Sequence, residues 1–310
     1  MTTDLFQSAN YLSFLSRIDL FEPFAFSVER EGKEVGRIQG YIQRDGGAVK
    51  RWLSRRAIVN EGPALAEDIT EAELEDLLQR CCSGLKNRAI YIETRNFRDY
   101  SAWRPVFERC GFHYEPHYDF IVDTSSLEIA ETNLGKSRKR DIRTSLRDGA
   151  CVVDDPSEDQ IIAFYSVLKE LYETKVKTPL FPIDFFLKLY HADFSRFLLV
   201  RYQHEIIGGT CCVFDKETVY EWFACGKDGV YKNIFPSTLA TWSGIKFAAE
   251  SGHKHFDMMG AGAPGDGGYG VREFKAKFGG ELVEYGRFKY ICDKPLYAIG
   301  KLGVKLMKRR

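Results

Sequence analysis

The sequence predicts an α/β chain of the α+β type, in which one unit of strands and helices occurs twice. Its 310 residues are enough for two domains of ordinary size. Each half shows the same order: a strand meander, a helix, a strand, an irregular or helical segment, and a strand. The two halves also show a weak internal sequence similarity: Val28 and Gly36 are eight residues apart, as are Val200 and Gly208.

The composition is typical of a globular protein with a sizeable core, since 44% of the residues are hydrophobic and 14% are aromatic. Lysine plus arginine equals aspartate plus glutamate, at 44 each, which argues against a globally basic nucleic-acid binder. The eight cysteines contain no CxxC pair, a poor zinc pattern. Without a recognisable signal peptide at the N-terminus, we expect reduced thiols and a cytoplasmic location.

The first domain is expected over residues 1–125. Residues 24–59 alternate apolar and polar side chains and break at Glu31-Gly32 and Gly46-Gly47, which predicts three antiparallel strands with tight turns. A capping box at Thr70 and Glu73 begins the helix "TEAELEDLLQRCCSGL". A strand "AIYIET", a helix near residues 100–110 and a strand "FHYEPHYDFIVD" are expected to follow.

The second domain is expected over residues 126–310. It opens with a basic helix, followed by a helix from Pro156 and another after Pro182. The strands "RFLLVRY", "EIIGGTCCVFD" and "TVYEWFACG" come next. A helix is expected from Pro236 to Gly252, because proline suits a first helical turn and glycine a helix end. Strands at "HKHFDMMG" and "ELVEYGRFKYIC" complete the pattern.

The basic helix, "NLGKSRKRDIRTSLRDG", carries six positive and two negative side chains. Lys136, Arg140, Arg143 and Arg147 are spaced so that they share one helical face. This face is either an ordinary solvated surface or a binding surface for a phosphate-rich ligand, because the planar guanidinium group donates two hydrogen bonds to one phosphate.

A glycine-rich stretch, "GAGAPGDGGYGVREFKAKFGG", follows the strand that ends near Asp257. It contains no P-loop pattern GxxxxGKS/T, and its glycines miss the spacing of a dinucleotide fingerprint. It places Arg272 and Lys275 next to Tyr269 and Phe274, so Lys275 is a candidate contact for an oxyanion or a phosphate. The alternative is a mobile turn followed by a solvated basic segment.

Four matches, in this order along the chain, resemble the Fem family of peptidoglycan-bridge aminoacyltransferases and their relatives, which are built from two GNAT-like domains. They are Glu61-Gly62-Pro63, the basic-helix pattern of Lys136, Arg138, Ile142, Arg143 and Gly149, the strand from Gly252 to Gly260, and the segment "FKAKFGG" from Phe274 to Gly280. The resemblance implies two tandem GNAT-like domains, each with a mixed, mostly antiparallel sheet flanked by helices.

The resemblance also implies an enzyme that transfers an acyl or aminoacyl group to an amine of a cell-wall or surface-polysaccharide precursor. The donor would be an aminoacyl-tRNA or an acyl-CoA, without a tightly bound cofactor or a metal. The acceptor would be a phosphate-bearing precursor, a nucleotide- or lipid-linked sugar, held near Lys136, Arg138 and Arg143. A CoA-dependent N-acetyltransferase of an amino sugar and a non-catalytic nucleotide- or RNA-binding scaffold are the alternatives.

By motif match, Phe274 and Lys275 line the active site, with Lys275 binding the oxyanion or phosphate. Aminolysis also requires a proton acceptor, for which Asp257 is the candidate, although it equally suits a cap of the following turn. The remaining candidates for substrate contacts are Arg272, Tyr269, Tyr220 and Tyr231, with Glu221 as a further side chain lining the cleft.

The C-terminal segment "LYAIGKLGVKLMKRR" combines apolar residues at near-helical spacing with five basic side chains. Such a helix either packs on the protein or lies on an anionic membrane surface. The second alternative implies peripheral contact at the inner face of the membrane. No stretch approaches the length of an apolar transmembrane helix.

Overall fold

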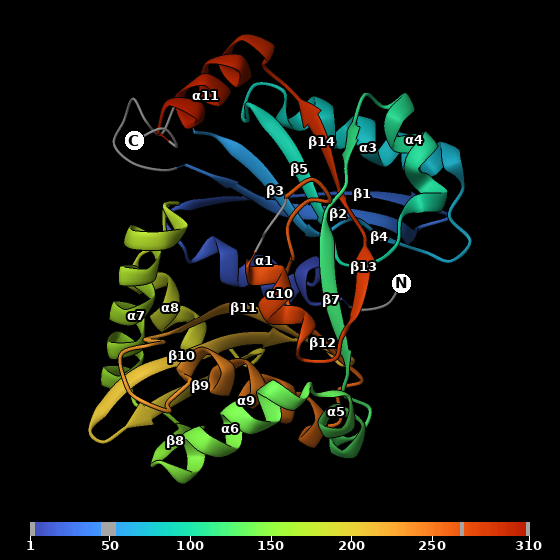
Figure 1. The fold of residues 1–310 in the computed structure, drawn as a ribbon. Helices are drawn as coiled ribbons and strands as arrows, with labels where there is room; N and C mark the ends of the chain where they lie inside the picture. The colour runs from blue at the N-terminus through green and yellow to red at the C-terminus, as the bar shows by residue number, and fades with distance from the viewer. Residues whose placement is uncertain (1–3, 45–53, 267–269, 308–310) are drawn as a thin grey trace. The chain divides into compact units, whose positions relative to one another are not determined.

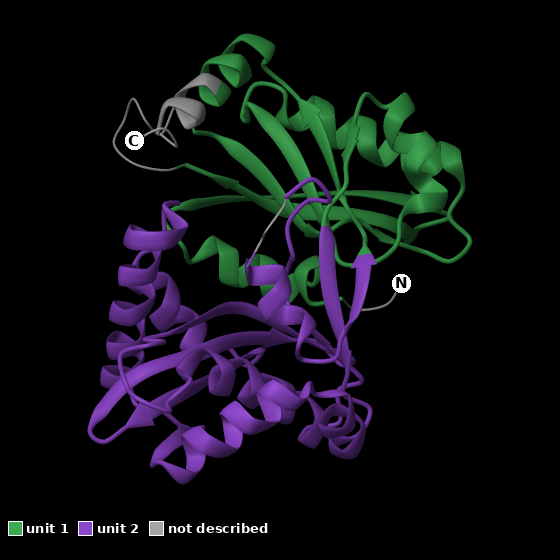
Figure 2. Ribbon diagram, in the orientation of Figure 1, with its two compact units in different colours: residues 1–117, 284–310 green, residues 118–283 purple. Residues whose placement is uncertain are grey.

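The computed structural model describes residues 4–44, 54–266 and 270–307, with side chains up to residue 301. The chain forms two compact units, Met1–His117 with Glu284–Arg310, and Tyr118–Val283 (Figure 2). Each unit contains a mixed sheet flanked by helices, which confirms the predicted α+β fold (Figure 1).

The first sheet has the strand order β1-β2-β3-β5-β14-β6, with β4 beside β2. Among the described strands of this sheet, the β3–β5 pair is parallel and the other pairs are antiparallel. The strands are β1 (Phe21–Arg30), β2 (Lys33–Gln43), β3 (Arg56–Glu61), β4 (Ala64–Leu65), β5 (Tyr91–Asn96), β6 (His113–Glu115) and β14 (Arg287–Ile291).

Helices α3 and α4 bury the apolar face of this sheet, while α1 packs on β1 and β2. The predicted capping box of α3 is present, with Thr70 and Glu73 bonded reciprocally. The predicted turn at Glu31-Gly32 is confirmed by positive φ at both residues, and the turn at Gly46-Gly47 lies outside the described residues. The helices are η1 (Leu5–Gln7), α1 (Ala9–Ser16), α3 (Glu71–Leu85), η2 (Ser101–Trp103), α4 (Arg104–Arg109) and α11 (Lys294–Met307).

The second sheet has the order β13-β7-β12-β11-β10-β9-β8, in which β11 and β12 are parallel. Its strands are β7 (Tyr118–Asp123), β8 (Ala150–Val153), β9 (Ser195–Tyr202), β10 (Glu205–Phe214), β11 (Thr218–Gly226), β12 (His255–Asp257) and β13 (Glu281–Glu284). Both sheets therefore place one parallel pair beside an antiparallel meander.

Helix α9 packs against β10 and β11, with α5 and α6 beside it, and α7 and α8 pack on the same sheet. As predicted, α9 begins at Pro236, and Gly252 follows its end with a φ of +83°. The helices are α5 (Leu127–Asn133), α6 (Lys136–Arg147), α7 (Glu158–Leu171), a π-helical turn η3 (Tyr172–Val176), α8 (Ile183–Tyr190), α9 (Pro236–Glu250) and α10 (Gly270–Ala276).

Two expected strands are each divided between the sheets. The segment "FHYEPHYDFIVD" breaks at Pro116, which cannot donate a ladder hydrogen bond, and yields β6 and β7. The segment "ELVEYGRFKYIC" breaks at Gly286, where φ is +64° and a Cβ atom would lie 2.3 Å from the Tyr114 ring. The units therefore differ from the expected domains 1–125 and 126–310, because β14 pairs with β5 and β6 of the first sheet.

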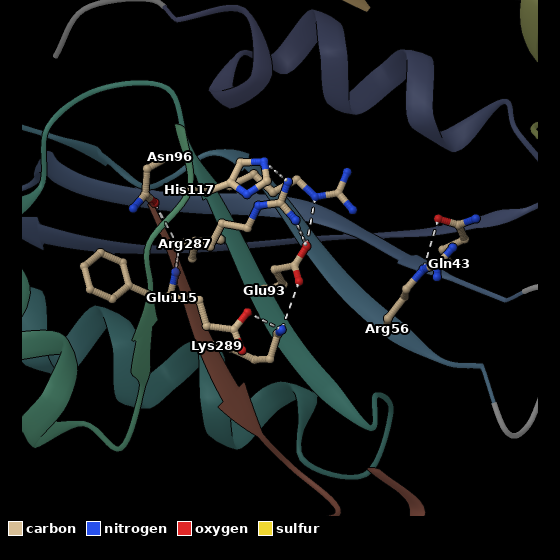
Figure 3. A network of polar contacts seen from close by, with 11 residues as sticks. Gln43, Arg56, Glu93, Asn96, Glu115, His117, Arg287 and Lys289 are labelled. Atoms are coloured by element: carbon tan, nitrogen blue, oxygen red, sulfur yellow. Dashed lines mark hydrogen bonds and ion pairs between the residues drawn. The ribbon is translucent and has the colours of Figure 1, made fainter. Parts of the chain in front are cut away.

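Buried ion pairs accompany the pairing of β14 with β5. Figure 3 shows the Glu93 carboxylate of β5 between Arg287 and Lys289 of β14. Its oxygens lie 3.0 Å from Arg95 Nε, 3.5 Å from Arg287 Nη1 and 3.4 Å from Lys289 Nζ. Burial alone would raise the pKa of Glu93, but the three cations outweigh it and lower the pKa to about 2.

A Glu93→Gln variant tests this contribution. Because the folded-state pKa lies below the ordinary value of 4.5, Glu93 stabilises the fold fully above about pH 5 and progressively less as the pH falls towards 2. We expect Glu93→Gln to lower the free energy of unfolding by about 3 kcal/mol at pH 7, measured in urea, with the difference shrinking below pH 4.5. Glu115→Gln, at a half-exposed partner of Lys289, is the control, and an equal loss there would contradict the assignment.

Candidate active site

The parallel strands β11 and β12 pair over a short distance only. Their register ends at Tyr220 opposite Asp257, although β11 continues to Gly226. Its antiparallel pairing with β7 continues beyond Asp257, since Met258 N donates to Phe120 O at 3.0 Å. The backbone pairing between the two central strands thus ends just before Glu221. In α/β proteins such a position at the carboxyl ends of strands is where ligands commonly bind.

A bulge follows the end of β12 at Met259 and Gly260. It lies between the Met258–Phe120 hydrogen bond and the bond from Ala261 N to Tyr118 O, which measures 2.7 Å. Met259 has a φ of +57° and Gly260 a φ of +97°.

Positive φ is costly for methionine and needs local support. That support comes from Asp257, whose Oδ1 accepts a hydrogen bond from Met259 N at 2.7 Å. This is the contact expected of Asp257 as a cap of the following turn, and its role as a proton acceptor stays a prediction.

Lys275 of α10 binds the carbonyl groups of this bulge. Its ammonium group donates to Met258 O, and to Gly260 O at 2.8 Å. An ammonium group has three N–H bonds, and these two contacts fix its direction while leaving one N–H without a hydrogen-bond acceptor among the residues that the structure describes.

Three carboxyl groups are buried near this ammonium group. Asp119 on β7, Asp257 on β12 and Glu221 on β11 are 7%, 1% and 6% exposed. Burial raises the pKa of all three, and the Lys275 charge opposes that rise. The pKa of Asp257 is raised furthest above its ordinary value, because the neighbouring Asp119 carboxylate adds repulsion.

Glu221 differs from the two aspartates in its partners. Its carboxyl group lies near the hydroxyls of Thr210 and Thr241, which lower its pKa slightly against the effect of burial. Its Oε1 atom is buried and makes no hydrogen bond within the described part of the chain. A buried acceptor without a partner is unusual in a native protein and marks Glu221 as a functional candidate.

Arg138 holds the segment that carries Lys275. Although the sequence grouped it with the phosphate-binding residues of the basic helix, it is 9% exposed and turns inward. Its guanidinium carbon lies 4.3 Å from the centre of the Phe274 ring and 5.2 Å from that of Phe278. It also donates to Thr238 Oγ1 at 3.2 Å and to Phe274 O at 3.4 Å. We therefore assign Arg138 a structural role, joining α6 and α9 to α10.

The glycines after α10 allow a close backbone approach to the α5–α6 connection. Gly135 N donates to Lys277 O at 2.9 Å. A Cβ atom on Gly279 would lie 2.2 Å from Asn133 O, and its φ is +82°. Only glycine fits this position, so "FKAKFGG" fixes the end of α10 against α5 and α6.

The other predicted contact residues are dispersed. Arg272 donates to Ala261 O at 2.8 Å and to Ala263 O at 2.5 Å, so it supports the glycine-rich loop. The hydroxyl of the buried Tyr220 donates to Asp215 at 3.1 Å, and that of Tyr231 to Glu205 at 2.6 Å. Both hydroxyls are thus bonded to carboxylates outside the Lys275 cluster.

Lys136 and Arg143 are exposed on α6, on the face predicted from their spacing. Tyr269 lies outside the described residues. Asp119 was missed by the sequence reasoning, and its signal was a single acidic residue at an inward position of the strand "YDFIVD".

Within the described residues, no group of histidine, cysteine, aspartate and glutamate side chains is arranged to hold a metal ion. Over the same residues, no helix is both long and apolar enough to cross a membrane. The eight cysteines are free thiols.

The FemAB family model matches residues 196–305, a range that contains β11, α9, β12 and Lys275. The crystal structure of FemX superposes with a TM-score of 0.72 at 15% identity, covering 96% of this chain and 94% of FemX. The chain has the Fem-type, GNAT-like fold. The predicted resemblance is thereby confirmed, and no curated protein matches the sequence.

Two further structures share this Fem-type fold. The C-terminal domain of a putative lysylphosphatidylglycerol synthetase from Agrobacterium fabrum has a TM-score of 0.61 at 14% identity, covering 97% of this chain and 92% of its own. A tandem GNAT protein from the clavulanic acid biosynthesis pathway has a TM-score of 0.52 at 10% identity, covering 91% and 94%. At these identities the likeness concerns the fold.

The role of Arg138 predicts a large effect of Arg138→Ala on stability. The change removes three hydrogen bonds, to Asp141, Thr238 and Phe274 O, and two ring contacts of a buried cation, so we expect the free energy of unfolding to fall by about 2–4 kcal/mol in urea denaturation. Arg140→Ala is the matched control, because Arg140 also pairs with Asp141 but its side chain is 74% exposed. It should change the same quantity by less than about 0.5 kcal/mol. Similar losses in both variants would contradict the assignment.

Proposed function

We propose that the protein is an aminoacyltransferase or related N-acyltransferase, which transfers its group to an amine of a cell-wall or surface-polysaccharide precursor. The observation that carries this proposal is the orientation of Lys275 by two bulge carbonyls within the segment matched by the FemAB model. The names of FemX and of the lysylphosphatidylglycerol synthetase support a reaction of the same kind on cell-envelope components.

The chemistry is attack of an amine on an ester or thioester, through a tetrahedral intermediate that carries an oxyanion. In the proposal the uncommitted N–H of Lys275 donates to that oxyanion. Because the bulge already fixes the ammonium group, little reorganisation is needed as negative charge develops. Phe274, which neighbours Lys275 in the chain, keeps its place through Arg138.

Glu221 is the proposed proton acceptor for the attacking amine. Burial raises the pKa of its carboxyl group, which makes the ionised form a stronger base, and its Oε1 atom has no hydrogen bond among the described residues. Because the ionised form is needed, the rate should fall on the acidic side of that raised pKa. A Glu221→Gln variant should be slow and lack this acidic limb of the pH–rate profile, and an unchanged limb would exclude the role.

Contacts at the start of α9 favour an aminoacyl-tRNA over an acyl-CoA as the donor. In GNAT-like folds the CoA pyrophosphate is expected at the amides preceding this helix, because a helix N-terminus attracts anions. Here Ser237 N donates to the Asp228 carboxylate at 3.2 Å, and Phe235 N to Ser145 Oγ at 3.0 Å. Two amides are thus occupied, and a carboxylate at the helix start repels a pyrophosphate. A CoA-dependent N-acetyltransferase is therefore the second candidate.

The exposed basic face of α6, with Lys136 and Arg143, is proposed to bind the phosphate of the precursor or of tRNA. Peripheral membrane contact through α11 also stays a proposal. Ile299 on this helix is 58% exposed, as an apolar contact with lipid would require. Salt-dependent binding of the protein to anionic vesicles tests that contact, and binding unchanged by deletion of residues 294–310 would refute it.

The donor is tested by offering the purified protein either charged tRNA or acetyl-CoA with candidate amines. Intact-mass detection of the acceptor then reports which group is added. A mass increase of one aminoacyl residue supports the proposal, whereas acetylation alone supports the second candidate. Ligand binding without any transfer would indicate a non-catalytic scaffold.

Replacement of Lys275 tests the mechanism. Lys275→Met removes the donor to the oxyanion, so kcat/KM should fall at least about tenfold, in the range found for single oxyanion contacts. Lys277→Met is the control, because Lys277 is exposed at the end of α10. It should retain kcat/KM within about twofold. Turnover of Lys275→Met near the wild-type rate would contradict the assignment.

A further inference from the structure

In the β7–β12 pair Asp257 lies opposite Ile121, so Asp119, two residues from Ile121, stands on the same face of the sheet, and the two carboxyl groups are placed to hydrogen-bond to each other. A carboxylate can only accept hydrogen bonds, so two ionised carboxylates cannot form such a contact. A single proton between the two groups would remove this conflict. Both side chains are almost fully buried, at 7% and 1% exposure, so solvent cannot separate their charges.

The surrounding donors indicate which aspartate holds this proton. Asp119 accepts from Phe120 N at 2.7 Å, faces the Gly260 amide, and would accept a third hydrogen bond from a protonated Asp257; such a set of donors suits an ionised carboxylate. Asp257 has one backbone donor, Met259 N at 2.7 Å, on its Oδ1 atom. Asp257 therefore has to accept one hydrogen bond and to donate another, and a neutral carboxylic acid can do both.

The backbone amides bound by the pair belong to the bulge that holds Lys275. Asp257 binds Met259 N, Asp119 binds the Gly260 amide, and the carbonyls of Met258 and Gly260 accept from Lys275 Nζ. The two aspartates therefore bind backbone amide groups of the bulge, and Lys275 binds backbone carbonyl groups of the same bulge.

We infer that Asp119 and Asp257 are positioning residues, which share one proton and keep the bulge carbonyls directed at Lys275. This inference rests on the proposed function of Lys275, and neither aspartate is required to touch a substrate. The charged groups that face the pair are Lys275 on α10 and Glu221 on β11. With Asp119 ionised, Lys275 charged and the proton on Asp257, the aspartate–lysine group is neutral overall, as burial demands.

The inference predicts an asymmetry between two otherwise equivalent substitutions. An asparagine amide supplies one oxygen acceptor and one N–H donor towards the pair, which is what neutral Asp257 supplies. Asp257→Asn should therefore lower kcat/KM clearly less than Asp119→Asn does. Asp119→Asn presents N–H donors where three hydrogen bonds must be accepted and removes the charge opposite Lys275. It should lower kcat at least about tenfold, with little change in KM.

A second readout does not depend on catalysis. An amine-selective acylating reagent, followed by peptide mass spectrometry, gives the labelling rate of Lys275 relative to exposed Lys277 in the same protein. Asp119→Asn should change this ratio at least about threefold, whereas Asp257→Asn should leave it near the wild-type value. A general loss of packing would alter both lysines together.

Equal effects of the two asparagine variants, or an unchanged labelling ratio in Asp119→Asn, would overturn the inference. If Asp119→Asn does not fold, the labelling ratio of Asp257→Asn remains decisive, because a change of threefold or more there also overturns the inference. If the two variants differ in labelling as predicted but the wild type transfers no acyl or aminoacyl group, the result supports the aspartate pair and refutes the proposed function.

Discussion

The hydrogen bonds from the Lys275 ammonium group to the carbonyls of Met258 and Gly260 are the contact on which the site depends. A lysine side chain is long and flexible, and fixing it costs up to about 2 kcal/mol of rotamer entropy. Two carbonyl acceptors on one bulge offset this cost and define a direction for the remaining N–H. The bulge lies where β12 has stopped pairing with β11 at Asp257 while its pairing with β7 continues.

Two further contacts keep α10 at the bulge. Arg138 packs on the Phe274 and Phe278 rings from α6, and Gly279 brings the backbone after α10 against Asn133. Both contacts are made by conspicuous parts of the sequence, the basic helix and the "FKAKFGG" segment. The basic helix thus supports the "FKAKFGG" segment, which gives a physical reason for the two segments to occur in one sequence. The exposed basic residues of the same helix remain available for a phosphate-bearing ligand.

Much of the fold could be predicted because it follows from local chemistry. The Thr70–Glu73 capping box, the Glu31-Gly32 turn and the start of α9 at Pro236 depend on neighbouring residues alone. The sequence could not show that β7 belongs to the second sheet and β14 to the first. An alternation of apolar and polar residues indicates a strand but does not indicate which sheet the strand joins. The inward orientation of Arg138 was also missed. Six basic residues along one helix predicted an exposed surface, either solvated or phosphate-binding.

The candidate site was predicted only in part. Motif spacing singled out Lys275, and the position of Asp257 at a strand end suggested a cap. Asp119 comes from a strand far away in the sequence, and its meeting with Asp257 depends on the pairing of β7 with β12. Glu221 was recognised as lining a cleft, but its unpartnered oxygen becomes visible only when Thr210 and Thr241 are placed around it.

The central claim is that the aspartate pair, the bulge and Lys275 act as one unit, and a double-mutant cycle in urea unfolding tests it without any substrate. Asp119→Asn, Lys275→Met and the double variant are compared with the wild-type free energy of unfolding at pH 7. The account predicts strong non-additivity, with a coupling energy above about 1 kcal/mol, because each change already releases the other's partner. Losses that add within about 0.5 kcal/mol would show that the two residues act independently and would contradict the account.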